Sequence, residues 1–249
     1  MDSVERAIAV MDYVATAGRP VAMAQISKQL SINKVSVWRT LSSLEQKQWI
    51  IKDSVTGLYT PGMGVLQLSV RLLSGLNLRS VSKPYLEKLN KDTQETVVLS
   101  VRVGLEHIFI ESLESPQTIR FVTPLGIPIP LSLGATGKVI LAYMEDFEKE
   151  QAISNLKKTR QKTYASGKAI DIQKIKDDLE EIRKRGFAVS IGERTAEAVA
   201  VTAPVFKKNA GAVGAIGAVG PVSRFTKDIA FSFGHLVSEA ASKISQALL

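Results

Sequence analysis

The chain has 249 residues, of which 45% are apolar and 22% are charged, a composition typical of a globular protein. This composition excludes a mainly disordered, collagen-like or coiled-coil chain. No cysteine is present, so disulfide scaffolds, thiolate metal sites and cysteine nucleophiles are also excluded. The sequence has neither a run of eighteen apolar residues nor a secretion-signal pattern at its start, which predicts a cytoplasmic protein without a membrane span.

Charge is distributed unevenly along the chain, whose net charge is +8. Residues 1–83 carry ten basic and five acidic side chains, whereas residues 84–249 carry 22 and 19. A basic first third suggests a polyanionic partner, most simply nucleic acid. A basic surface that only aids solubility is the alternative, and charge alone does not decide between the two.

The first sixty residues predict three helices followed by a hairpin. The helices are expected at about 3–17, 22–30 and 33–48, and the hairpin at 49–60. Ser3 and Asn33 are the expected caps of the first and third helices. The order helix, helix, helix, hairpin is that of a winged helix-turn-helix.

The third helix has an apolar face and an unusual opposite face. Val37, Leu41 and Leu44 lie within one arc and should be buried. The opposite arc holds Val35, Ser36, Arg39, Ser42, Ser43 and Gln46. Short hydrogen-bonding groups, one arginine and no acid suit the major groove, where arginine reads guanine edges and apolar groups contact thymine methyls. A merely polar, solvated face is the alternative.

If this helix enters the major groove, its side chains and those of the hairpin contact DNA. We expect Ser36 and Arg39 nearest the base edges, and Lys34 or Thr40 nearer the phosphates. Polar residues of the hairpin could contact backbone phosphates, which position a protein without reading the sequence. The full set of expected contacts is Lys34, Val35, Ser36, Arg39, Thr40, Ser43, Lys52 and Thr56.

Three short segments of this region match a known family. They are Val4-Glu5-Arg6-Ala7, Lys34-Val35-Ser36-Val37-Trp38-Arg39 and Tyr59-Thr60-Pro61-Gly62. The region resembles the N-terminal domain of IclR-type bacterial transcriptional regulators. Family members usually have Leu-Gly at 61–62 and a Ser-Thr pair at 35–36, so this chain departs from the pattern on the helix that faces the groove. The resemblance therefore implies the fold and DNA binding, but not the operator sequence.

The rest of the chain predicts helices and strands that are joined mostly by hairpins. Helices are expected at about 63–74, 78–92, 138–144, 174–185 and 226–248, and strands at 96–103, 106–113, 119–123, 187–191, 199–206 and 212–219. Pro84 interrupts the start of the second of these helices. Hairpin connections predict a largely antiparallel sheet.

This second part also matches the same family, in the segments "TPLGIPIPLSLGATGKVILAY", "IRKRGFAVS" and "TAPVF…GAIGAVGPVSR". The segments resemble the GAF-like effector-binding domain of IclR-type regulators, so the resemblance covers nearly the whole chain. It implies an α+β protein with a helix-rich winged helix-turn-helix domain at 1–60, a linker helix and dimerisation region at 61–82, and a GAF-like domain with a mostly antiparallel sheet at 83–249. A single larger domain that buries the linker helix is the alternative.

Gly134-Ala135-Thr136-Gly137-Lys138 is the most informative short motif of the second part. It is not a P-loop, because its glycines are too close and no Ser or Thr follows the lysine. Small residues at a helix start leave backbone N–H groups open and favour an anion, such as the carboxylate of a small metabolite, with Thr136 as a further donor. The resembled family places its effector here. An ordinary glycine-rich helix start is the alternative.

The resemblance implies an effector pocket built from several segments. The expected set is Phe121, Leu125, Ala135, Thr136, Gly137, Ser190, Glu193, Ala200, Gly217 and Val219. Many family members have acidic or other polar groups at 190 and 192, a cysteine at 200 and serines at 217 and 219, where this chain has smaller or less polar residues. Few polar contacts away from the anion end favour an apolar or aromatic acid over a small oxo-acid. Loss of ligand sensing is the alternative.

An enzyme is not favoured. The two histidines, His107 and His235, belong to no HExxH, GxSxG or Cys–His arrangement and are expected to be structural or surface residues. No cofactor or metal is expected. We therefore predict a sequence-specific regulator that binds a double-stranded DNA operator, responds to a small carboxylate effector, and forms a homodimer or a tetramer. A small-molecule-converting enzyme with an appended helical domain and a protein-binding module are the alternatives.

Overall fold

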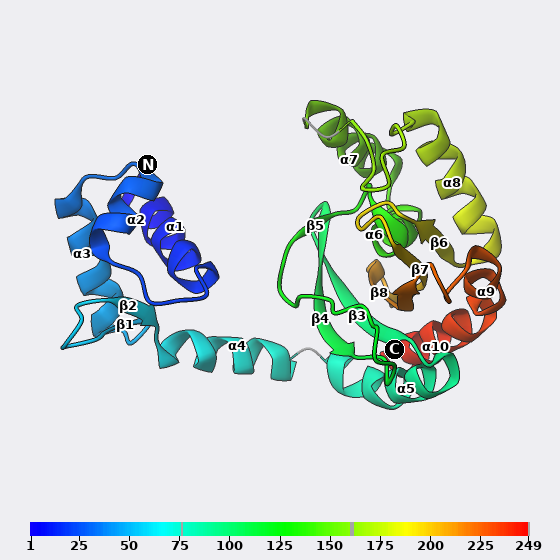
Figure 1. Ribbon diagram of the computed structural model, residues 1–249, viewed down its shortest axis with the longest axis horizontal. Coiled ribbons are helices and arrows are strands. Elements are labelled where there is room, and N and C mark those ends of the chain that lie inside the picture. The colour runs from blue at the N-terminus through cyan, green and yellow to red at the C-terminus, as the bar shows by residue number, and fades with distance from the viewer. Residues whose placement is uncertain (76, 160–161, 249) are drawn as a thin grey trace. The chain divides into compact units, whose positions relative to one another are not determined.

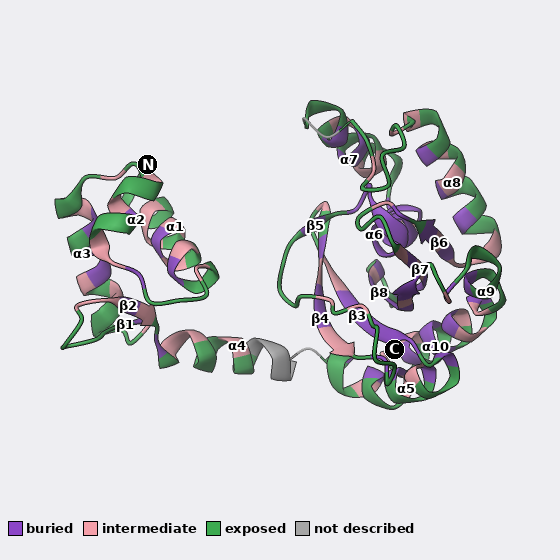
Figure 2. Cartoon of the chain, viewed as in Figure 1, coloured by how far each residue is buried: buried purple, intermediate pink, exposed green. Residues whose placement is uncertain are grey.

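The computed structural model describes residues 1–75, 77–159 and 162–248. The chain forms two compact units, Met1–Leu76 and Asn77–Leu249 (Figure 1). Each unit buries its own apolar core, coloured purple in Figure 2. Within the described part of the chain, no helix is long and apolar enough to span a membrane.

The N-terminal unit contains three helices, a hairpin and a fourth helix. Their bounds are α1 Ser3–Thr16, α2 Met23–Leu30, α3 Lys34–Gln46, β1 Ile50–Lys52, β2 Tyr59–Pro61 and α4 Met63–Gly75. The two strands pair antiparallel, and the turn between them is the wing. This order confirms the predicted winged helix-turn-helix.

Local hydrogen bonds fix where the helices of this unit begin. The Asp2 carboxylate accepts hydrogen bonds from two amides of the first turn of α1, and the Glu5 carboxylate accepts one from the Asp2 amide at 2.9 Å. The prediction that Ser3 is the cap was therefore wrong by one residue, because Asp2 can accept both amides. Asn33 caps α3 as predicted, since its side chain accepts a hydrogen bond from the Ser36 amide at 2.9 Å.

The core of the N-terminal unit lies between the three helices and the hairpin. It contains Val10, Val14, Val21, Ile26, Val37, Leu41, Ile50 and Tyr59. The predicted inward face of α3 is confirmed, because Val37 and Leu41 are at most 1% exposed. This packing leaves the opposite face of α3 open.

The C-terminal unit is built on a curled sheet of six strands in which every neighbouring pair is antiparallel, as predicted. The spatial order is β5-β4-β3-β8-β7-β6. The strands are β3 Thr96–Val103, β4 Glu106–Leu113, β5 Ile129–Pro130, β6 Ala188–Ile191, β7 Ala198–Lys207 and β8 Gly211–Pro221.

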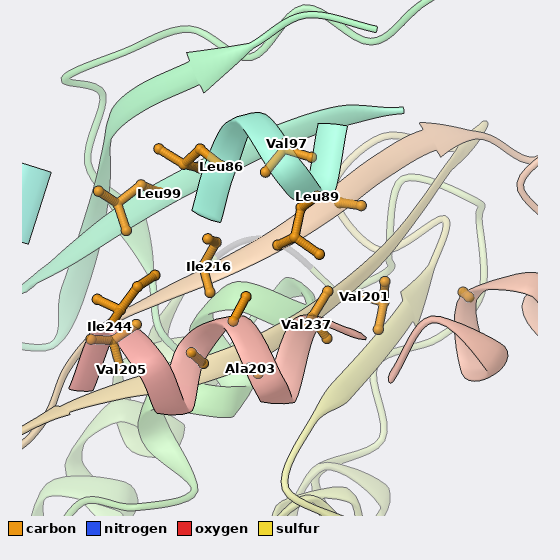
Figure 3. Packing of buried hydrophobic residues seen from close by; sticks show 14 of the residues in the cluster. Leu86, Leu89, Val97, Leu99, Val201, Ala203, Val205, Ile216, Val237 and Ile244 are labelled. Atoms are coloured by element: carbon orange, nitrogen blue, oxygen red, sulfur yellow. The ribbon is translucent and has the colours of Figure 1, made fainter. Parts of the chain in front are cut away.

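Helices cover both faces of this sheet. The bounds are α5 Asn77–Thr93, α6 Gly134–Leu141, α7 Asp146–Lys158, α8 Ile172–Arg185, α9 Lys227–Ser232 and α10 Gly234–Ala247. On one face, α5 and α10 pack against the central strands, and Leu86 and Leu89 of α5 belong to one apolar cluster with Val237 and Ile244 of α10 and with Val205 of β7 (Figure 3). On the other face, α6, α7 and α8 enclose a second apolar cluster.

Three predicted elements of this unit were placed wrongly. Residues 119–123 form an extended loop rather than a strand, and the Phe121 carbonyl accepts a hydrogen bond from the Thr96 hydroxyl at 2.7 Å. Helix α6 begins at Gly134 instead of residue 138, because Gly134 adopts the left-handed conformation that turns the chain into the helix. The predicted C-terminal helix is divided at Phe233 into α9 and α10.

Candidate functional site

Helix α3 presents most of the predicted DNA contacts on its open face. Lys34, Val35, Arg39 and Ser43 are exposed, whereas Ser36 is half-buried. The sequence analysis missed Trp38, whose exposed fraction is 57%. The signal available in the sequence was its position about 100° from Val37 around the helix, outside the arc of Val37, Leu41 and Leu44. With Val35 it gives this face an apolar group that suits thymine methyls beside the guanidinium of Arg39.

Thr40 does not share this open face. It is 7% exposed, and its hydroxyl donates to the Ser36 carbonyl at 2.9 Å and accepts from the Arg6 guanidinium at 3.2 Å. The expectation that Thr40 contacts a phosphate is corrected, because its hydroxyl ties α3 to α1.

The two predicted contacts in the wing differ in role. Lys52 is exposed and lies 5.8 Å from the ring centre of Tyr59. Thr56 is exposed, but its hydroxyl donates to the Asp53 carboxylate at 2.8 Å and its amide donates there at 2.6 Å. These bonds lower the pKa of Asp53 and shape the turn that ends at Gly57. Thr56 therefore organises the wing, while Lys52 stays exposed beside Tyr59.

A cavity lies in the C-terminal unit on the face of the sheet that carries α6. It is bounded by β3, β4, β6, β7, β8, the loop at 121–124, the loop at 193–195 and the start of α6. The centres of water-sized molecules can occupy about 100 Å³ of it. One water occupies roughly 10–15 Å³ of such a volume, so the cavity has room for about seven to ten waters. If each non-hydrogen atom of a ligand takes the place of about one water, the cavity fits a small organic acid.

Seven of the ten predicted effector contacts line this cavity. They are Phe121, Ala135, Thr136, Ser190, Glu193, Ala200 and Val219. Leu125, Gly137 and Gly217 are outside its lining. Leu125 is half exposed, whereas a Cβ at Gly137 would lie 2.6 Å from the Leu131 carbonyl oxygen and one at Gly217 would lie 2.1 Å from the Val201 carbonyl oxygen. These two glycines permit close backbone packing rather than ligand contact.

Glu193 is not free for a ligand. Its carboxylate accepts a hydrogen bond from the Gly134 amide at 2.9 Å and binds the ammonium of Lys138 at 2.6 Å. Asp178 binds the same ammonium at 2.9 Å. Burial alone would lower the pKa of Lys138, which is 2% exposed, but the two carboxylates outweigh this effect and raise it. The network joins the start of α6, α8 and the loop that carries Arg194.

Five polar side chains that line the cavity were not predicted from the sequence, namely those of His107, Thr123, Arg194, Thr195 and Thr202. His107 is fully buried, and neither ring nitrogen has a hydrogen-bond partner among the described residues. Thr202 is 1% exposed, and its hydroxyl likewise has no partner there. Arg194 is exposed at the rim, with its guanidinium 5.8 Å from the ring centre of Phe109 and no carboxylate within ion-pair distance among the described residues.

The electrostatic state of these groups follows from their surroundings. Burial, and then the charge of Arg194, lower the pKa of His107 to about 3, so the imidazole is neutral at pH 7. Burial also lowers the pKa of Arg194, which stays charged. The cavity thus offers the guanidinium of Arg194 together with uncharged hydrogen-bonding groups, among them the His107 imidazole and the Thr202 hydroxyl. Among the residues described, no cluster of His, Asp and Glu could hold a metal ion.

Comparison with known families decides what kind of protein carries these sites. The family model "IclR helix-turn-helix domain" matches residues 3–54, and the model "Bacterial transcriptional regulator IclR C-terminal" matches residues 70–246. The chain belongs to the IclR family. The resemblance identified from the sequence is therefore confirmed.

Curated relatives of this IclR-family chain are regulators. The HTH-type transcriptional repressor AllR of Escherichia coli K12 is 28% identical over 246 residues, which cover 99% of this chain and 90% of the relative. The HTH-type transcriptional regulator KipR of Bacillus subtilis is 28% identical over 228 residues, which cover 92% of this chain and 90% of the relative. The protein is thus a transcriptional regulator with a DNA-binding helix-turn-helix, and the prediction that it is not an enzyme is confirmed.

Solved structures of IclR-family proteins share the fold. The Thermotoga maritima IclR structure is 26% identical, with a TM-score of 0.76, and the match covers 99% of this chain and 98% of that one. An IclR homologue from Microbacterium hydrocarbonoxydans, complexed with 4-hydroxybenzoate, is 18% identical with a TM-score of 0.84 and covers 99% of both chains. This second likeness shows the fold alone.

Proposed function

We propose that this regulator binds a two-fold symmetric operator as a homodimer, and that a small organic acid in the C-terminal cavity changes its affinity for that operator. The N-terminal domain at 1–60 reads DNA, residues 61–82 link and dimerise the chains, and residues 83–249 bind the effector. The protein acts in the cytoplasm, where bacterial operators lie.

The open face of α3 supports the DNA-reading role. In this proposal Arg39 and Ser36 contact base edges in the major groove, and the exposed Val35 and Trp38 are apolar contacts. Lys34, Ser43 and, in the wing, Lys52 contact phosphates in this proposal. An acid-free face with free basic groups suits a polyanion, and the absence of acidic side chains from 54 to 86 extends this property beyond the wing.

A single observation carries the effector role: the cavity holds buried polar groups, those of His107 and Thr202, that have no hydrogen-bond partner among the residues that the structure describes. A cation at the rim, next to the start of α6, supports a carboxylate ligand, because a charged group gains most from an oppositely charged partner where water is partly excluded. Buried polar groups without a partner destabilise a folded protein, so their presence in the cavity favours a ligand that pairs with them over a site that has lost its function.

Helix α4 supports the dimer. Four of its large apolar side chains are exposed within one copy of the chain: Met63, Leu66, Leu68 and Val70. A second copy would cover them, and two DNA-binding domains would then meet two half-sites. Sedimentation velocity tests this proposal, since a monomer at micromolar concentration would contradict it.

Selection of bound fragments from randomised DNA tests the DNA-binding role. The purified wild-type protein should enrich a palindromic motif at near-physiological salt, and the Arg39→Ala variant should lose that enrichment. A wild-type protein that enriches nothing, and that ignores DNA at low salt as well, would overturn the proposal.

Variants at the start of α6 test the effector role. Thr136 lines the cavity, so Thr136→Val should remove the response of operator binding to the acid and keep the operator affinity of the free protein. A wild-type dose response in this variant would contradict the assignment of the cavity.

A further inference from the structure

The C-terminal unit contains a second hollow, at the end of β7 that leads into the turn to β8. It lies between this end of β7, α10, Tyr143 and Gly186, and it shares no lining residue with the cavity beside α6. The centres of water-sized molecules can occupy about 400 Å³ of it, against about 100 Å³ in the cavity beside α6. We call this hollow the β7–α10 groove, and the proposed function gives it no role.

The groove forms because strand β6 is shorter than its neighbour. Strand β6 pairs with β7 only from Val199 to Thr202, whereas β7 continues to Lys207. The face of α10 that lines the groove carries small side chains, at Ser238, Ala241, Ser242 and Ser245. The missing length of strand and the small side chains together leave the space.

The open edge of β7 is not suited to an added strand. Pro204 has no N–H, and the Phe206 N–H donates to the Ser245 hydroxyl at 2.9 Å. The Ser245 hydroxyl in turn donates to the Ala241 carbonyl at 2.7 Å. An added strand needs free backbone donors along the edge, so an occupant of the groove is held by side chains instead.

The charges around the groove are all of one sign. Lys207 and Lys208 line it, and its described lining contains no Asp or Glu. Both lysines are exposed, and neither has a carboxylate within ion-pair distance among the described residues. The guanidinium of Arg183 lies 5.8 Å from the ring centre of Tyr143, which adds a third cation behind the aromatic wall. The complementary occupant is an anion with more than one charge.

The groove also offers an aromatic surface and an unpaired hydroxyl. The rings of Tyr143 and Phe206 meet edge to face with their centres 5.0 Å apart, and Phe206 is 36% exposed, so its ring has area left for a planar group. The Ser238 hydroxyl lines the groove, is buried, and has no hydrogen-bond partner among the described residues. Buried polar groups are normally paired, so this hydroxyl indicates a ligand with a polar group at the base of the groove.

We propose that the β7–α10 groove binds a nucleoside polyphosphate. Lys207 and Lys208 bind its phosphates, the base stacks on Phe206, and Ser238 hydrogen-bonds to the base or the sugar. One water occupies roughly 10–15 Å³ of such a volume, so the groove has room for about 27 to 40 waters, and a nucleoside triphosphate has about 30 non-hydrogen atoms. The cavity beside α6 is too small for this ligand, so the groove is a second ligand site whose existence does not depend on the effector role of that cavity.

Titration calorimetry on the full-length protein tests the inference by dividing the ligand into its parts. ATP, GTP, adenosine and inorganic tripolyphosphate would be compared up to millimolar concentrations, at near-physiological salt and without a divalent cation. ATP should bind at least about tenfold more tightly than adenosine and than tripolyphosphate, because only ATP engages both the lysines and the aromatic ring. GTP should bind about as tightly as ATP, because stacking is tolerant of the base.

A double lysine variant tests the phosphate contacts. Lys207→Gln with Lys208→Gln should weaken ATP and tripolyphosphate by at least about tenfold. Lys157→Gln with Lys158→Gln is the matched control, because these adjacent lysines of α7 are also exposed but do not line the groove. The control should leave both affinities unchanged.

Two further variants test the ring and the hydroxyl. Phe206→Leu keeps an apolar side chain and should weaken ATP by about tenfold while leaving tripolyphosphate unchanged. Ser238→Ala removes only one hydroxyl and should weaken ATP by about fivefold, so it tests the site even if Phe206→Leu fails to fold. Arg39→Ala, on the open face of α3, should not change ATP binding.

Several results would overturn the inference. They are no binding of ATP at millimolar concentration, equal affinity for ATP and tripolyphosphate, and equal losses in the two double lysine variants. A loss of ATP binding in Arg39→Ala alone would place the nucleotide on the DNA-binding face. Binding of hexaglutamate without binding of ATP would make the groove a docking surface for an acidic protein segment. Each of these results leaves the proposed function intact, since neither the operator nor the acid effector contacts this groove.

Discussion

The buried, neutral state of His107 makes a prediction about stability that needs no ligand. In the folded protein its pKa is about 3, because burial and the nearby Arg194 disfavour the protonated imidazole. In the unfolded chain a histidine has a pKa near 6.5. Below about pH 6.5 the unfolded state therefore binds one more proton than the folded state, and acid favours unfolding through this residue.

The magnitude follows from proton linkage. Between about pH 6.5 and pH 3 a difference of one bound proton changes the free energy of unfolding by about 1.4 kcal/mol per pH unit. The part of the stability that depends on a neutral His107 is fully present above about pH 6.5 and is lost as the pH falls. Between pH 7 and pH 5 the free energy of unfolding of the His107→Phe variant should therefore fall by about 2 kcal/mol less than that of the wild type.

Urea denaturation of both proteins at pH 7, 6 and 5 would measure this difference. The His235→Gln variant, which removes the other histidine from an exposed position on α10, is the control. At pH 7 the phenylalanine variant should be at least as stable as the wild type, because it removes buried polar atoms that have no partner. Parallel pH curves for the wild type and His107→Phe would refute the reasoning.

Three further predictions concern other residues. Arg39→Ala should reduce discrimination between the selected operator and random DNA by about 1–3 kcal/mol in competition titrations, and equal weakening on both would rule out a base contact. Thr40→Val should lower the free energy of unfolding by about 1 kcal/mol without altering the salt dependence of DNA binding; a shallower salt slope would show a phosphate contact. Glu193→Gln should destabilise the C-terminal unit by about 3 kcal/mol, or about 6–12 °C in calorimetry, because it leaves the buried Lys138 with Asp178 alone. An unchanged melting temperature would refute this, and the exposed ion-pair variant Glu181→Gln is the control.

The winged helix-turn-helix was predictable because its signals are local. Helical spacing of apolar residues and the Asn33 cap identified α3, and its buried face agrees with the structure at Val37 and Leu41. The errors arose where long-range contacts override local preference. Residues 119–123 are β-prone, yet they form a loop held by the Thr96 hydroxyl, a contact that spans 25 residues and leaves no trace in a local pattern.

The cavity was predictable only in part. The motif at the start of α6 pointed to its position, and Ser190 and Ala200 lie where expected. His107 and Thr202 could not be found, because a strand pattern shows that alternate side chains share a face but not whether that face meets a core or a cavity. A register shift in the β3–β4 ladder between Leu99 and Ser100 adds to this ambiguity.

The central claim is that an acid bound in the C-terminal cavity changes operator binding. Fluorescence anisotropy with the selected operator, with and without the tightest-binding acid, tests it most directly. The account predicts a shift of about 5- to 150-fold in operator affinity for the wild type and none for Thr136→Val. Superimposable wild-type binding curves at saturating acid would contradict it.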